Sequence, residues 1–239
     1  MTSPQPTSIF AKANLLTSLV LVLPLLVFYE IGVLASDQMN GADLITSTLV
    51  RMVGVQGLIW TQVGLMVLVV GIAIYLRKNQ QLKLKQILPV LIESLIYALM
   101  MGTFIIYVMV DLLGIDPRLA AVPLAKAGVF QKLVMSVGAG VHEELIFRLL
   151  LLGGLVAVLT KTHMVERTWL AFLIALVISS VLFSAVHHIG PLGDALRVGV
   201  FVYRIIAGVL FGLLYQFRGF AVAVYTHAIY DIYVLVIAG

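Results

Sequence analysis

The sequence predicts an all-α fold, a polytopic membrane helical bundle of seven transmembrane helices. Three observations indicate this fold class. Hydrophobic residues make up 62% of the 239 residues, and the mean hydropathy is +1.13. Charged residues make up only 11%, whereas a soluble domain carries about 25%. The apolar residues also gather in runs of roughly 20 residues, the length that an α-helix needs to cross a bilayer.

These apolar runs divide the chain in order. The first follows a short polar N-terminal tail and is too long for the core of a cleavable signal peptide, so we expect it to be retained. The segment 43–55 is expected to be an interfacial helix, and its insertion would raise the number of spans to eight. Glu93, near the start of the third run, is expected to be an interfacial carboxylate. The predicted spans are 13–35, 57–76, 87–110, 129–161, 167–187, 197–215 and 220–238.

The distribution of charge predicts the orientation in the membrane. The net charge is +4 and the isoelectric point is near 9.4. Basic loops on the cytoplasmic face account for such an excess, so it does not indicate nucleic-acid binding. Counting spans along the chain places the basic positions on one side of the membrane: the loops 77–85 and 161–167, and Arg218. This distribution predicts a cytoplasmic N-terminus. We expect the membrane to be a prokaryotic plasma membrane. The chain has no cysteine, which excludes disulfides, thiolate nucleophiles and cysteine-ligated metals.

One apolar run contains a group of ionisable residues. Glu143, Glu144 and Arg148 lie within 129–161, where charged side chains are costly and usually belong to a pair or a functional site. On a helix, Glu144 and Arg148 stand four residues apart and can pair along one face. Glu143 is turned by about 100° from Glu144, so it can point into a cavity instead. The alternative is an ion-pair cluster that only fixes helix packing.

Two later runs also carry polar residues at membrane depth. His187 ends the fifth run, four residues after Phe183, and His227 and Asp231 stand four apart in the seventh. At ~1.5 Å per residue, Glu143 and His187 lie roughly 27–30 Å from the basic loops that border their helices, whereas His227 lies about 12 Å from the start of its helix. We therefore expect a tilted helix, a bent helix or re-entrant geometry to bring the three groups to one depth.

The order of these motifs resembles the CPBP family, which contains CAAX-processing type II prenyl endopeptidases and bacteriocin-processing or Abi proteins. The chain carries Glu-Glu-x-x-x-Arg at 143–148, Phe-x-x-x-His at 183–187 and His-x-x-x-Asp at 227–231, on separate helices. The resemblance covers about 130–239. It implies a single integral-membrane domain, 1–239, with N-terminal helices without motif at 13–126 and a catalytic core at 127–239.

The resemblance also implies a function. It indicates an intramembrane endopeptidase that cuts a membrane-associated or lipid-modified protein or peptide, with the lipid bilayer as its other partner, no nucleic acid and no cofactor. Hydrolysis in a water-poor site needs a base, a positioned water and donors to the developing charge. The roles carried over are a general base, Glu143, assisted by His187; an orienting and balancing pair, Glu144 and Arg148; and an oxyanion-stabilising pair, His227 and Asp231.

One position departs from the family pattern. Many relatives have an amide where this chain has Asp231, and an ionised carboxylate cannot donate a hydrogen bond. Asp231 could instead orient His227 from one helical turn away, or pair with Arg204 in the sixth run.

Other functional classes stay open on the residues alone. His142 and Glu143 begin like the zinc motif His-Glu-x-x-His, but Ile146 occupies the place of the second histidine, so this motif is absent. The remaining histidines could still bind a metal, which the predicted hydrolysis does not need. A non-proteolytic immunity factor, or a scaffold for another membrane protein, would carry the same polar core. A transporter would also carry polar residues at membrane depth, but many transporters are built from internal repeats and the chain has no evident repeat.

Overall fold

The computed structural model describes residues 12–35, 44–115, 128–189 and 195–237. These residues form helices, and no strand occurs among them, as the sequence predicts. The α-helices are α1 (Leu15–Ala35), α2 (Leu44–Leu76), α3 (Ile87–Tyr107), α4 (Val129–Glu144), α5 (Gly153–Lys161), α6 (Thr168–Val186), α7 (Val198–Arg218) and α8 (Phe220–Ile232). Short turns of other helix types are η2 (Leu84–Gln86), η3 (Val108–Leu112), η5 (Leu145–Leu152) and η6 (Tyr233–Ile237).

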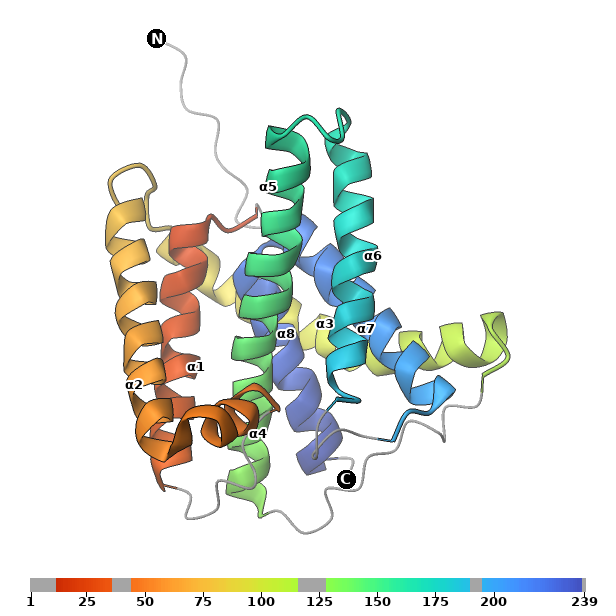
Figure 1. Cartoon of the computed structure of the whole chain (residues 1–239), viewed down its shortest axis with the longest axis horizontal. Helices are drawn as coiled ribbons and strands as arrows, with labels where there is room; N and C mark the ends of the chain where they lie inside the picture. Colours follow the sequence, from red (N-terminus) through yellow and green to blue (C-terminus); the bar gives the residue numbers. More distant parts are fainter. Residues whose placement is uncertain (1–11, 36–43, 116–127, 190–194, 238–239) are drawn as a thin grey trace.

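Within the described ranges, six helices are long and apolar enough to cross a membrane. They fall on six of the seven predicted runs; the exception is 129–161. That run is also helical, because α4, η5 and α5 follow one another without a break and form one continuous rod (Figure 1). This rod carries the ionisable residues, which makes it more polar than the other six.

Helix α2 consists of two parts that meet at Gly54. The backbone of Gly54 has φ 70° and ψ 177°, a conformation that suits glycine and ends a helix. The part before Gly54 points in a different direction from the long part after it (Figure 1). The expected separate segment 43–55 is therefore a short helix from Leu44, while Asp43 lies outside the described residues. Its place at a membrane surface stays a prediction.

Helices α4 and α8 cross at the centre of the bundle, and small residues allow their close approach. A Cβ atom on Gly140 would lie 2.8 Å from the backbone nitrogen of Ala228, too close for any side chain. The Gly-x-x-x-Gly face of α7, formed by Gly208 and Gly212, packs in the same way on α6. A Cβ on Gly208 would lie 3.0 Å from the Cα of Ser180. These two close contacts set the distances between the helices that carry the polar residues.

The start of α8 is fixed against the N-terminal helices. Gly219 has φ 102°, which lets α7 turn directly into α8, and a Cβ there would lie 3.1 Å from the carbonyl oxygen of Ala13. Glu93 on α3 pairs with Arg218 through two contacts, one of them 2.8 Å between Oε2 and Nε. Glu93 is thus a partner in an ion pair between helices, and its place at the membrane interface stays a prediction.

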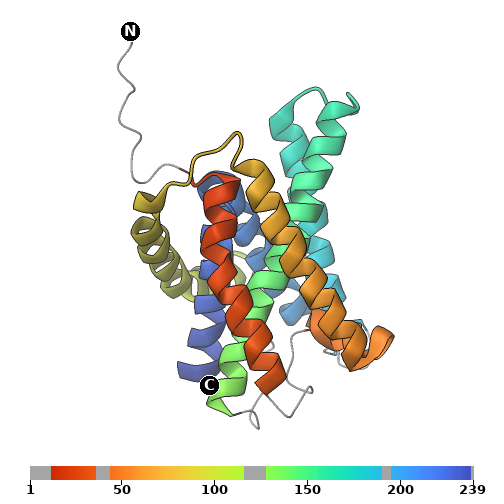
Figure 2. The same ribbon diagram turned by 90° about the vertical axis from the view of Figure 1, so that its left-hand side faces the viewer.

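Along its helix, His227 lies closer to the start than Glu143 and His187 lie to the ends of theirs. The helices begin at different levels, and this accounts for the difference. The hairpin of α5 and α6 extends well beyond the start of α1 in both views (Figures 1 and 2). The turn at Gly219 lies beside Ala13, at the level where α1 begins. The distances of Glu143 and His187 along their helices start at the α5–α6 hairpin, whereas the distance of His227 starts at Gly219, which lies closer to the site. The longer and the shorter distances therefore end at the same depth.

Candidate active site

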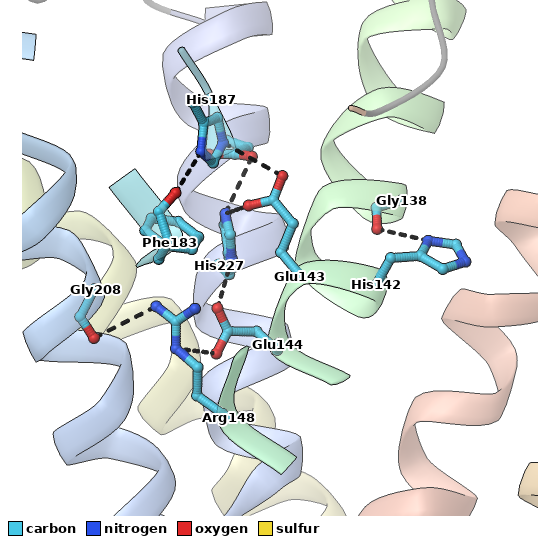
Figure 3. Close-up of polar contacts among 10 residues, drawn as sticks. Gly138, His142, Glu143, Glu144, Arg148, Phe183, His187, Gly208 and His227 are labelled. Carbon is cyan, nitrogen blue, oxygen red and sulfur yellow. Dashed lines mark hydrogen bonds and ion pairs between the residues drawn. The ribbon is translucent and has the colours of Figure 1, made fainter. Parts of the chain in front are cut away.

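The structure brings the six predicted site residues together from three parts of the bundle. Glu143 and Glu144 end α4, and Arg148 follows in η5. His187 caps the C-terminal end of α6, and His227 and Asp231 lie one turn apart on α8. Figure 3 shows the side chains of the first five around one point between these helices.

Glu143 lies between two imidazole rings. Its Oε1 is 3.5 Å from Nε2 of His187, and its Oε2 is 3.9 Å from Nε2 of His227 (Figure 3). The residue is only 4% exposed. A buried carboxylate needs such polar neighbours, because its burial is otherwise costly.

The orientation of His187 follows from a hydrogen bond to its own helix. Its Nδ1 donates to the carbonyl oxygen of Phe183 at 2.7 Å, which fixes the proton on that nitrogen. The Nε2 atom is therefore the one that faces Glu143. The Phe-x-x-x-His spacing has a direct structural reason, since residues four apart on a helix can make this contact.

Behind Glu143, Glu144 joins His227 to Arg148. The Oε1 atom of Glu144 accepts a hydrogen bond from Nδ1 of His227 at 2.8 Å, and its Oε2 is 3.1 Å from Nε of Arg148. The predicted Glu144–Arg148 pair along one helix face is present. Arg148 also donates from Nη2 to the carbonyl oxygen of Gly208, at 3.4 Å. Glu144 and Arg148 are almost fully buried, so this pair forms the innermost part of the site.

Asp231 lies on the other side of the His227 ring. Its Oδ2 is 3.5 Å from Nε2 of His227, and its side chain is 25% exposed. Of the alternatives left open by the sequence, this geometry favours Asp231 as the residue that orients His227. A negative group thus lies near each nitrogen of one imidazole ring.

Comparison with protein families identifies the part of the chain that holds this site. Residues 125–233 match the family described as type II CAAX prenyl endopeptidase Rce1-like, and all six site residues lie inside that match. Over these residues the chain resembles this family. This match and the six described helices that could cross a membrane together support an integral membrane protein related to a protease family. Neither the curated proteins nor the solved structures gave a match.

Aromatic side chains surround the polar groups of this Rce1-like site. The ring of Phe183 has its centroid 4.4 Å from Cζ of Arg148, and Phe211 lies 5.3 Å from the same atom. Phe211 also stacks on His227, with ring centroids 4.3 Å apart and an angle of 18°. Phe183 stands within a motif that the sequence shows, whereas Phe211 is one apolar residue of an apolar helix and gives no such signal.

The chain after Glu144 changes from an α-helix to the π-helical turn η5. Such turns are rare and occur often at functional sites, because they widen the helix and redirect side chains. The hydroxyl of Ser179 on α6 donates to the carbonyl oxygen of Phe147 within this turn, at 2.7 Å. This hydrogen bond ties η5 to α6 and so supports the position of Arg148.

His142 precedes Glu143 in the chain but does not join the site. Its ring points away toward α1 (Figure 3), where it contacts Tyr29 edge-on with centroids 4.7 Å apart. Its Nδ1 donates to the carbonyl oxygen of Gly138, and its Nε2 lies 3.5 Å from Nε2 of Gln62. Among the residues that the structure describes, no three His, Asp or Glu side chains form a group that could hold a metal ion.

Proposed function

We propose that this Rce1-like protein is an intramembrane endopeptidase in which Glu143 activates a water molecule for attack on a peptide bond. The observation that carries the proposal is the place of the Glu143 carboxylate, buried between His187 and His227 at 3.5 and 3.9 Å. A packing cluster would need only the Glu144–Arg148 pair, which balances its own charge. Glu143 is an additional buried carboxylate, and its nearest partners are side chains that can exchange protons.

The contact between Glu143 and His187 supports a water-binding role. In neutral His187, Nδ1 carries the proton that Phe183 accepts, so Nε2 has a lone pair and faces a carboxylate oxygen. Two acceptors this close are best bridged by a molecule that donates to both, and water does so. We infer that this water is the nucleophile and that Glu143 takes its proton.

His227 is proposed to stabilise the oxyanion of the tetrahedral intermediate. Glu144 holds Nδ1 of the ring at 2.8 Å, which leaves Nε2 on the side of Glu143. A proton on Nε2 makes this atom a donor for the carbonyl oxygen of a substrate. Arg148 binds the other oxygen of Glu144, at 3.1 Å. The pair therefore orients His227, much as the aspartate orients histidine in a serine protease.

The proposed substrate is a membrane-associated or lipid-modified protein or peptide. The family description names CAAX prenyl endopeptidases, so a prenylated peptide with a C-terminal CAAX sequence is the first choice of probe. The basic loops 77–85 and 161–167 lie at one end of the bundle (Figure 1). We propose that this end faces the cytoplasm of a prokaryotic cell, following the excess of positive charge.

The decisive experiment compares Glu143→Gln with the unchanged protein in liposomes, using a farnesylated CAAX reporter peptide. We expect kcat to fall roughly 10²- to 10⁴-fold, the contribution of a general base, with little change in folding. Glu166→Gln is the matched control, because Glu166 is exposed between α5 and α6, far from the site. A Glu143→Gln variant as active as the unchanged protein would disprove the catalytic role.

The non-proteolytic alternative needs a test in cells. Membrane peptides from cells that contain the unchanged protein are compared with those from cells with Glu143→Gln at equal protein level. Proteolysis predicts new peptide ends with the unchanged protein only. A binding or scaffolding function predicts identical peptides in both samples together with an unaltered phenotype.

A further inference from the structure

We infer that Phe211 is a positioning residue of the active site, which holds the His227 ring and the Arg148 guanidinium in their working orientation. Phe211 lies on α7, a helix that contributes none of the six predicted site residues. The inference rests on the proposed function, in which His227 must present Nε2 to the substrate.

The contact between Phe211 and His227 is a face-to-face stack. The ring centroids are 4.3 Å apart and the planes differ by 18°. Phe211 is 2% exposed, so it cannot be a surface that the substrate reaches. The imidazole is therefore bounded by Glu144 at its Nδ1 edge and by Phe211 across its face. These two contacts restrict both rotations of the side chain.

The same aromatic ring lies close to Arg148. The Cζ atom of Arg148 is 5.3 Å from the centroid of Phe211, within the range of a cation–π interaction. Arg148 is 1% exposed, and the nearby carbonyl of Gly208 is a hydrogen-bond partner at 3.4 Å. Gly208 and Phe211 stand three residues apart, so they lie on one face of α7. This face contacts both Arg148 and His227.

The packing of α7 on α6 explains why Phe211 is held firmly. A Cβ on Gly212 would lie 2.3 Å from Cδ1 of Leu176, so a side chain there would have to displace this buried leucine. Gly208 makes the equivalent contact with Ser180. Because these glycines flank Phe211, the ring between them has little freedom to move away from His227.

Replacement by leucine separates positioning from packing. Leucine is apolar and nearly fills the same space, but it has no π face for the imidazole or the guanidinium. We expect Phe211→Leu to lower kcat roughly ten- to a hundredfold, the scale of a small misplacement of a catalytic group, and to leave KM within about threefold. Phe220→Leu is the matched control, because Phe220 on α8 is 3% exposed and belongs to a hydrophobic cluster that contains none of the six site residues.

A second measurement does not depend on catalysis. NMR spectra of histidine-labelled protein report the ring protons of His227, which are assigned with a His227→Asn variant; the chain has five histidines. Protons above an aromatic face are shifted upfield. We expect the His227 signals to move downfield in Phe211→Leu, and to stay in place in Phe220→Leu.

The outcomes distinguish the two proposals. If neither the unchanged protein nor Glu143→Gln cuts any peptide, the proposed function fails, and the NMR comparison still tests the stack. Unmoved His227 signals in Phe211→Leu would overturn the inference. So would an unchanged kcat, or an equal loss of kcat in Phe220→Leu, because either result would reduce Phe211 to ordinary packing.

Discussion

At the scale of single residues, exposure to solvent follows the proposed roles. Glu144 and Arg148, which would only orient His227, are the most deeply buried, and Glu143, His187 and His227 lie nearer the surface. Asp231, the other orienting residue, is an exception and lies at the edge of the site. The exposed fractions are 25% for Asp231, 17% for His187, 6% for Glu143 and His227, 1% for Arg148 and 0% for Glu144. Electrostatic catalysis requires charged groups that are held in place before the substrate binds, next to catalytic groups that the substrate can reach.

The role of Asp231 can be tested by replacing its carboxylate with an amide. If Asp231 orients His227 by accepting from Nε2 at 3.5 Å until a substrate oxygen takes over that hydrogen bond, then Asp231→Asn keeps an acceptor but loses its charge. A charge-assisted hydrogen bond is about twice as strong as a neutral one. We therefore expect kcat to fall about tenfold, which is ~1.4 kcal/mol. Steady-state kinetics on the reporter peptide measure the change.

The control for this change is Asp111→Asn, the same substitution at an exposed position in η3. It should leave kcat unaltered. A variant Asp231→Asn that matches or exceeds the unchanged protein would refute the orienting role of the Asp231 charge.

Sequence reasoning at this scale succeeded where helix geometry alone decides a contact. The spacing of Glu144 and Arg148 predicted their pairing, because residues four apart on a helix are neighbours. The same spacing could not predict which nitrogen of His187 faces Glu143, since this depends on the carbonyl of Phe183. Phe211 was missed for a related reason: its contacts come from the crossing of helices, and an apolar residue in an apolar run looks like all the others.

At the scale of helices, small residues determine which side chains can meet. Glu144 reaches His227 because α4 and α8 approach closely at Gly140 and Ala228, one turn before the glutamates. The sequence shows a glycine before the paired glutamates, a residue type that allows such an approach. It could not predict the levels along the bundle at which the helices begin and end. Helices α5 and α6 extend beyond the others, and hydropathy does not show this.

The helix crossing gives a second prediction. Gly140→Ala places a methyl group 2.8 Å from the backbone nitrogen of Ala228, so α4 and α8 must move apart. We expect a loss of about 1–3 kcal/mol in the free energy of unfolding, and a fall in kcat of more than about tenfold as the Glu144–His227 contact lengthens. Thermal unfolding in detergent and kinetics with the reporter peptide measure both effects.

Gly154→Ala is the control for this crossing. Gly154 lies in α5, on the same continuous rod, but no atom lies within 4 Å of the position of its Cβ. Alanine there should stabilise the helix by up to about 1 kcal/mol, since glycine is the poorer helix former. If both variants unfold at the same temperature as the unchanged protein, the α4–α8 contact does not set the geometry of the site.

At the scale of the whole molecule, the N-terminal helices that carry no motif still support the site. Helix α8 holds His227 and Asp231, and it packs against α1, α3 and α4 as well as α7. Its first turn is fixed by the Glu93–Arg218 pair and by Gly219 against Ala13. The N-terminal helices thus contribute to the position of α8, although they contribute none of the six predicted site residues.

The ion pair between Glu93 and Arg218 tests this dependence. The two side chains are 13% and 24% exposed, so removing one leaves the other charge partly buried without its partner. We expect Glu93→Gln and Arg218→Gln each to lower the free energy of unfolding by about 1–3 kcal/mol, and the double variant to lose less than the sum. Lys85→Gln, at an exposed basic position near the start of α3, should change stability very little.

Activity at a temperature where all variants are folded should fall only a few fold, because the pair lies at the start of α8 and its effect reaches His227 through two turns of helix. Additive losses in the double variant would mean that the two charges act separately, and then the N-terminal helices would not hold α8 through this contact.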